Sequence, residues 1–256
     1  MQVMELRDGW GVEHVHPGLR PDPAPGPGEV LIRMAAASIN YRDSVVLRRG
    51  YGRLSGELPL IILQDGAGEV IEVAPGVTRV KRGDLVCPIG APGWYAGPLR
   101  PEHRDSLLGG PRDGGMRERM AVSAEDVVKA PSFYSAEEAA TLPCAAVTAW
   151  TAVVDGGVKP GDVVVTQGTG GVSLFALQFA HALGAAVIVT SSRPEKLERA
   201  KAMGADYGID YRATPDWHRE VRRLTGGGAD LVIEVGGAET LEQSLRAVRV
   251  GGTIAL

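Results

Sequence analysis

The run Val163–Ala182 (VVVTQGTGGVSLFALQFAHA) constrains the fold of this chain more than any other segment. Its first three residues are β-branched and predict a buried strand, and a glycine-rich turn and a helical pattern follow without a spacer. Glycines let the backbone approach a diphosphate closely, and a helix N-terminus offers it unpaired N–H groups. The pattern Gly168-x-Gly170-x-x-Ser173 therefore predicts a dinucleotide-binding unit, with serine where glycine or alanine is usual. An ordinary strand-to-helix turn of another α/β protein is the alternative.

Composition excludes several classes of protein. A length of 256 residues allows two domains, and the formal charge of −4 gives no electrostatic footprint for nucleic acid. The two cysteines cannot form a disulfide framework or a cysteine-rich zinc site. There is no apolar run of about 18 residues for a membrane span, and no signal-peptide pattern at the N-terminus. We therefore expect a cytoplasmic protein that acts on a small molecule, without nucleic acid or membrane as a partner.

Residues 1–127 have the pattern of short strands and loops. Strands are expected at Glu29–Ala36, Gly68–Val73 and Asp84–Pro88, each bounded by a glycine-containing turn. Residues 90–115 form a long loop, and loops of that length often serve a site. This half is therefore expected to be a β-rich domain.

Residues 128–256 alternate strands with helices. Ser135-x-x-Glu138 is a capping box that opens a helix. Strands are expected at Val163–Gln167, Ala186–Thr190, Tyr207–Asp210, Leu231–Val235 and Thr253–Leu256, with helices between them. The alternation predicts a doubly wound parallel sheet, so the fold class is α/β. This sheet is one strand short of the usual dinucleotide fold, and we expect it to be truncated after its fifth strand.

The segment Thr190–Lys196 (TSSRPEK) bears on which nicotinamide cofactor would bind. An acid at the end of the second strand would hold the ribose of NAD, and none is present here. Arg193 and Lys196 can neutralise a 2′-phosphate and Ser192 can donate to it, which predicts NADPH. The alternative is that both cations only solvate an exposed helix start, and Glu195 works against a phosphate unless the helix turns it outward.

Further motifs occur along the whole chain. They are Asn40-Tyr41-Arg42-Asp43, Asp65-Gly66-Ala67-Gly68-Glu69-Val70, Leu142-Pro143-Cys144-Ala145 with Thr148-Ala149-Trp150, Gln167–Ser173, Ser192–Lys196 and Glu234-Val235-Gly236-Gly237. With them the chain resembles the zinc-free, quinone oxidoreductase-like branch of the medium-chain dehydrogenase/reductase superfamily. The resemblance implies a GroES-like substrate domain at residues 1–127 and a Rossmann domain at residues 128–256.

The same resemblance lets the metal positions be compared. Zinc-dependent relatives place Cys, then His-Glu, then Cys or Asp at the metal. This chain has Asn40 at the first position and Gln64-Asp65 at the second, so Cys144 alone remains. One thiolate cannot hold a catalytic zinc, which takes about three protein ligands. We expect no metal site.

The resemblance also implies which residues line the site. Asn40 and Tyr51 would line the acceptor pocket, with Tyr51 or water as the proton source. The implied cofactor contacts are Thr148, Gly168, Gly170, Gly171, Val172, Ser192, Arg193, Lys196, Tyr211, Val235 and Gly236. The alternative roles are a turn-forming asparagine before a helix for Asn40 and a half-exposed loop aromatic for Tyr51.

Without a zinc to polarise a carbonyl, reduction of an electron-poor acceptor needs least assistance. We therefore expect an NADPH-dependent oxidoreductase that transfers hydride to a quinone or an α,β-unsaturated carbonyl compound. The alternatives are an NADP-dependent alcohol or aldehyde oxidoreductase, and an NADPH-binding protein with little catalysis. The resemblance implies a homodimer.

Overall fold

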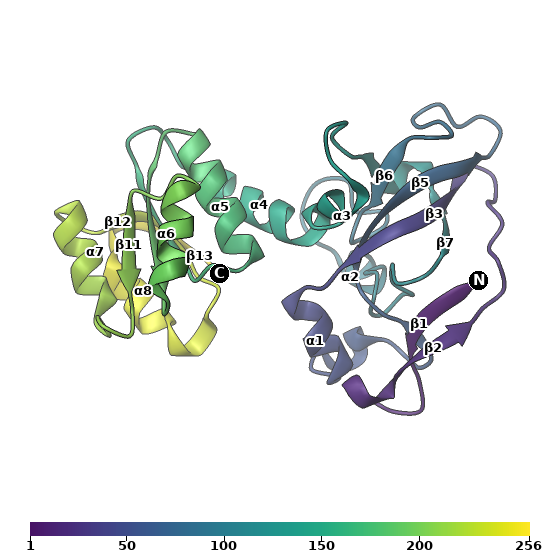
Figure 1. Ribbon diagram of the computed structural model, residues 1–256, viewed down its shortest axis with the longest axis horizontal. Helices are drawn as coiled ribbons and strands as arrows, with labels where there is room; N and C mark the ends of the chain where they lie inside the picture. Colours follow the sequence, from purple (N-terminus) through teal and green to yellow (C-terminus); the bar gives the residue numbers. More distant parts are fainter. The chain divides into compact units, whose positions relative to one another are not determined.

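The computed structural model describes all residues from 1 to 256, which form two compact units, Met1–Cys144 and Ala145–Leu256. The first runs from purple to teal in Figure 1 and the second from teal to yellow. Their boundary lies later than the expected division at 127/128, because Ala139 of α3 (Ala136–Ala139) packs against Ala67 and Cys87 of the first unit. None of the helices has the length and apolar character needed to cross a membrane.

The first unit is rich in antiparallel strands, as expected. Its larger sheet has the order β7-β3-β5-β6-β8, and a smaller sheet has the order β2-β1-β4. The strands are β1 (Gln2–Leu6), β2 (Val15–Leu19), β3 (Glu29–Ser38), β4 (Leu60–Ile61), β5 (Asp65–Val73), β6 (Leu85–Pro88), β7 (Arg119–Ser123) and β8 (Val127–Lys129). The helical elements are η1 (Val12–His14), α1 (Tyr41–Leu47), η2 (Gly52–Ser55), α2 (Pro101–Asp105), η3 (Ala124–Asp126) and α3. Val30 and Ile32 of β3 share one face and are fully buried in the core of this unit.

The loop expected at residues 90–115 is partly ordered by local contacts. It contains α2, and the rings of Trp94 and His103 stack with their centroids 5.9 Å apart. Asp126 holds its first part, because its Oδ1 accepts hydrogen bonds from the Gly93 N–H at 2.7 Å and the Tyr95 hydroxyl at 2.9 Å.

The second unit contains the expected five-stranded parallel sheet, with the doubly wound order β11-β10-β9-β12-β13. The strands are β9 (Val163–Gln167), β10 (Ala186–Ser191), β11 (Tyr207–Asp210), β12 (Ala229–Ile233) and β13 (Val248–Ala255). The helical elements are η4 (Leu142–Ala146, shared with the first unit), α4 (Val147–Asp155), α5 (Gly171–Ala182), α6 (Pro194–Ala202), α7 (Trp217–Thr225), η5 (Gly237–Glu239) and α8 (Leu241–Ala247). The adjacent strands β9 and β12 are parallel, so the residues that follow them meet at one edge of the sheet.

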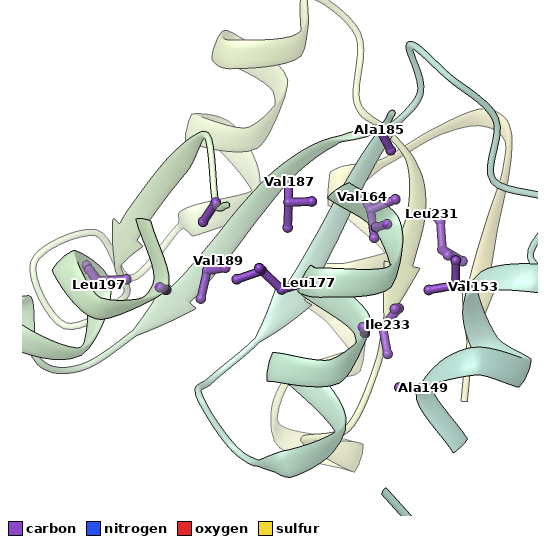
Figure 2. Close-up of a cluster of buried hydrophobic side chains, with 14 residues drawn as sticks. Ala149, Val153, Val164, Leu177, Ala185, Val187, Val189, Leu197, Leu231 and Ile233 are labelled. Carbon is purple, nitrogen blue, oxygen red and sulfur yellow. The ribbon is translucent and has the colours of Figure 1, made fainter. Parts of the chain in front are cut away.

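Helices cover both faces of this sheet. On one face Val164 and Val189 pack with Leu177 of α5 in the cluster that Figure 2 shows. On the other face Val165 packs with Trp217 and Val221 of α7. Consecutive strand residues point to opposite faces, so Val164 and Val165 enter different cores. This double burial holds the ends of the strands, and hence the turns after them, in place.

Candidate cofactor and acceptor sites

The glycine turn after β9 leaves open space at its backbone. Gly168 has φ +70°, a conformation that favours glycine, and its N–H donates to the Thr190 hydroxyl at 3.3 Å. A Cβ atom added at Gly168 or Gly170 would meet nothing within 4 Å. Gly170 is the N-cap of α5, and no side chain caps that N-terminus. The first N–H groups of a helix have no partner within it, so this end can hold a phosphate.

Serine in the third fingerprint position has a structural role here. The buried Ser173 hydroxyl donates to the Gln167 carbonyl at 2.6 Å and so fastens α5 to the end of β9. Gly171 packs closely on the preceding helical segment, because a Cβ there would lie 3.2 Å from the Ala145 Cβ. Thr148 lies on α4 shortly after Ala145 and is exposed.

Unpaired positive charge gathers where β10 ends. Arg193 is the N-cap of α6, and both Arg193 and Lys196 are exposed and make no ion pair within the protein. Ser192 is half-buried, and the Tyr211 N–H donates to the Ser191 carbonyl at 3.1 Å. Tyr211, which is 42% exposed, is thereby brought beside the end of β10. Because neither Arg193 nor Lys196 pairs with a carboxylate, both cations are free to bind an anion.

Glu234, directly after β12, is a feature whose role the sequence did not reveal. It is 5% exposed. Its carboxylate accepts hydrogen bonds from five donors, which are Gln167 Nε2 (2.7 Å), the Ser244 hydroxyl, the Gly236 N–H (2.7 Å), the Gly237 N–H (2.9 Å) and the Thr240 hydroxyl (2.5 Å). Burial alone would raise the pKa of Glu234, but these hydrogen bonds outweigh it and hold the pKa below its ordinary value.

This carboxylate fixes the loop that follows β12. The loop contains Val235, which is 50% exposed, and Gly236, whose added Cβ would lie 2.2 Å from the Thr240 hydroxyl oxygen. The strand end at Gln167 and the loop at Val235–Gly236 are therefore tied together through Glu234. The signal in the sequence was an acid between a buried strand and two glycines, a pattern too common to assign.

In the first unit two carboxylates hold Asn40. The Asn40 N–H donates to Asp43 Oδ2 at 2.7 Å, and its side-chain Nδ2 donates to Asp65 Oδ2 at 3.0 Å. The same Asp65 oxygen accepts the Cys144 N–H at 2.9 Å, and Asp43 Oδ1 accepts the Gln64 N–H at 3.2 Å. Residues far apart in the sequence thus meet around one amide.

Burial sets the electrostatics of this cluster. The Asp65 side chain is fully buried and its Oδ1 has no hydrogen-bond partner. Burial raises the pKa of Asp65 to about 6, against the opposing hydrogen bonds from Cys144 and Asn40. Burial likewise raises the pKa of the Cys144 thiol to about 11 and raises that of Asp43. At neutral pH the Cys144 thiol is therefore protonated.

Tyr51 is not joined to this cluster by any hydrogen bond. It is the N-cap of η2 and 44% exposed, and its N–H donates to the Ser55 hydroxyl at 3.3 Å. Its own hydroxyl makes no hydrogen bond within the protein and is free to meet a ligand.

The donors around Asn40 do not match a zinc site. A catalytic zinc takes about three protein ligands, usually His, Cys, Asp or Glu. No group of three or more such residues has the geometry to hold a metal ion. The Asn40 amide nitrogen donates to Asp65 and has no free electron pair for a metal, so Asn40 does not supply the ligand that a cysteine would supply at this position.

Two family models match the chain. Residues 26–132 match the alcohol dehydrogenase GroES-like domain and residues 171–256 match the zinc-binding dehydrogenase domain. A zinc-type alcohol dehydrogenase-like protein of Schizosaccharomyces pombe is 44% identical over 234 residues, which cover 90% of this chain and 67% of that protein.

Solved structures are similar over nearly the whole chain. An NAD-dependent alcohol dehydrogenase superposes with a TM-score of 0.89 at 38% identity, covering 99% of this chain and 76% of that one. A mycobacterial protein complexed with NADPH gives 0.81 at 31%, covering 100% and 73%. A quinone oxidoreductase of Pseudomonas syringae gives 0.80 at 29%, covering 99% and 75%. The chain therefore belongs to the medium-chain dehydrogenase/reductase superfamily, and it is an oxidoreductase of that family.

Proposed function

We propose that this protein is an NADPH-dependent reductase that transfers hydride to a quinone or an α,β-unsaturated carbonyl compound without zinc. The observation that carries the proposal is the uncapped N-terminus of α5, where added Cβ atoms at Gly168 and Gly170 meet open space. Backbone N–H groups at such a helix start favour a diphosphate. Gly171 and Val172 continue this first turn, and Val235 and Gly236 lie on the loop after the adjacent strand β12. The similar mycobacterial protein complexed with NADPH supports the choice of ligand.

The free cations at the end of β10 favour the phosphorylated cofactor. Arg193 and Lys196 have no carboxylate partner, so a 2′-phosphate would not have to displace one. A hydrogen bond to a charged group contributes about 1.5–3 kcal/mol, which corresponds to a preference of about tenfold to a hundredfold for NADPH over NADH. Ser192 would add a neutral donor.

NADPH, when bound, supplies the hydride for the acceptor carbon. The chain must then stabilise the negative charge that develops on the acceptor oxygen and provide one proton. The amide of Asn40 would donate to that oxygen, because its side chain has a second N–H not used by Asp65. The hydroxyl of Tyr51, or water, would supply the proton. Donors of this kind suffice for an electron-poor acceptor but give little help to an unactivated carbonyl.

A second candidate is an alcohol or aldehyde oxidoreductase. The similarity to an NAD-dependent alcohol dehydrogenase and the match to the zinc-binding dehydrogenase domain favour it. The donor set around Asn40 argues against it, because oxidising an alcohol at neutral pH usually needs a Lewis acid at the oxygen.

The test is NADPH oxidation after exhaustive treatment with EDTA, with a panel of quinones and enones, beside alcohol oxidation with NADP. We expect enone or quinone turnover that EDTA leaves unchanged. Asn40→Ala should lower kcat and Tyr51→Phe should lower it only if Tyr51 supplies the proton. Turnover of alcohols alone, or turnover restored by added zinc, would overturn the proposal in favour of the second candidate. Binding of NADPH without turnover of any acceptor would leave a binding protein.

We extend the proposal to assembly as a homodimer in the cytoplasm. The dimer is what the resemblance to the superfamily implies. Light scattering on the purified protein tests the dimer, and microscopy of the tagged protein tests the location.

A further inference from the structure

The Asp65 carboxyl is a buried charge without a cationic partner. It lies at the start of β5, and only its Oδ2 atom is hydrogen-bonded, by Asn40 and by the Cys144 N–H. The nearby guanidinium of Arg42 makes no ion pair with Asp65: it lies 3.7 Å from Asp43 Oδ1 and donates to the carbonyls of Leu108 and Gly110. Burying a charge under these conditions is costly. A purely structural position would favour a neutral residue, so the carboxylate calls for a functional reason.

We propose that Asp65 is a positioning residue that fixes which end of the Asn40 amide faces the acceptor. The inference rests on the proposed function, in which Asn40 donates to the acceptor oxygen. A carboxylate only accepts hydrogen bonds, so the NH₂ end of Asn40 must face Asp65. The Asn40 Nδ2 nitrogen also carries the second N–H, whose direction is set by the N–H that donates to Asp65.

The backbone of Asn40 is held independently of this bond. Its N–H donates to Asp43 at the first turn of α1, and its carbonyl accepts the Asp43 N–H at 3.1 Å. The remaining freedom is rotation of the side chain, including the flip that exchanges the amide oxygen and nitrogen. Asp65 removes that freedom, because a flipped amide would place its oxygen against the carboxylate. A neutral asparagine at position 65 would accept either orientation.

A double-mutant cycle on kcat tests this directly, with NADPH saturating and an accepted enone or quinone as substrate. We expect Asp65→Ala to lower kcat about tenfold to a hundredfold, the loss of one charge-assisted hydrogen bond at the site. In the Asn40→Ala background the same replacement should cost nothing further, because Asp65 acts through Asn40. The affinity for NADPH, measured by fluorescence titration, should stay unchanged in all three variants.

Asp65→Asn separates positioning from folding. It keeps the size and removes the buried charge, so we expect a thermal midpoint at pH 8 no lower than that of the wild type, together with a reduced kcat. Glu5→Gln is the matched control, because Glu5 is also a buried carboxylate of the first unit but pairs with Arg20. Its kcat should equal that of the wild type.

Three outcomes overturn the inference. Losses that multiply in the double variant, or full kcat in Asp65→Asn, would show that Asp65 does not act through Asn40. If the wild-type protein turns over no acceptor, the proposed function and this inference fail together. If the wild type turns over an acceptor and only the variants depart from expectation, this inference alone fails.

Discussion

Replacing Glu234 by glutamine should destabilise the second unit far more than a change of one atom suggests. Glutamine keeps the size of the side chain but turns one acceptor oxygen into a donor NH₂ group. If its oxygen takes the place of Oε1, which accepts three hydrogen bonds, its NH₂ group meets Gln167 Nε2 and the Ser244 hydroxyl. The serine can rotate and accept. The amide of Gln167 cannot turn without losing the bond from the Gly236 N–H to its oxygen at 3.2 Å.

The size of the effect follows from that arrangement. One buried donor left without an acceptor costs about 1–3 kcal/mol, and the hydrogen bonds that remain lose the strength that the charge gave them. We therefore expect the free energy of unfolding of the second unit to fall by about 2–4 kcal/mol at pH 7.

The effect should depend on pH in a defined direction. The hydrogen bonds hold the pKa of Glu234 below its ordinary value, in spite of burial. The stabilisation by the ionised group is therefore complete above the unfolded pKa of about 4.3 and is lost as the pH falls through the folded pKa. The difference between wild type and Glu234→Gln should shrink in that acidic range.

Hydrogen exchange measured by mass spectrometry is the suitable assay, because peptides from β9 and β12 report on this unit alone. Glu198→Gln is the matched control, since the Glu198 side chain is 71% exposed and pairs only with Lys201. We expect the control to change the exchange free energy by less than about 0.5 kcal/mol. The reasoning would be refuted if Glu234→Gln changed it equally little.

Other variants test the remaining features. Gly168→Ala should lower the free energy of unfolding by about 1–2 kcal/mol in urea titrations, through strain at φ +70° without a clash. Gly170→Ala, at φ −78°, should unfold like the wild type yet weaken NADPH in a calorimetric titration, because its methyl group fills the space proposed for the diphosphate. Arg193→Ser should weaken NADPH about tenfold and leave NADH unchanged in the same titration. For Asp65, the folded pKa of about 6 lies above the ordinary value, so wild-type stability should fall as the pH rises from about 4 to 6. Burial raises the pKa of Asp43 as well, so Asp43 causes part of this loss of stability. Asp65→Asn should therefore lose less stability than the wild type over this pH range, which thermal melts would show.

The sequence predicts the second unit closely because glycines and periodicity mark its elements. The strand Tyr207–Asp210 has the predicted bounds, and the capping box of Ser135 and Glu138 forms as predicted. The small sheet of β1, β2 and β4 was missed, since β2 contains Pro17 and Gly18 and β4 has only two residues. Such strands are stabilised by partners distant in the chain, which local patterns do not encode.

The candidate sites also differ in how far the sequence predicts them. The glycine turn and the cations after β10 are continuous in sequence, and their local geometry could be anticipated. The roles of Glu234 and Asp65 depend on donors far away in the chain, such as Ser244 and Cys144. A single acid in a sequence does not reveal which donors surround it once the chain is folded. The later domain boundary has a similar cause, since it depends on where Ala139 packs.

A paired titration of the purified protein with NADPH and NADH tests the proposed cofactor site. The open N-terminus of α5 and the unpaired Arg193 and Lys196 predict saturable NADPH binding, with NADH weaker by about tenfold or more. Equal or tighter binding of NADH would contradict the phosphate site at the end of β10. Binding of neither nucleotide would contradict the cofactor site itself, and with it the proposed reduction.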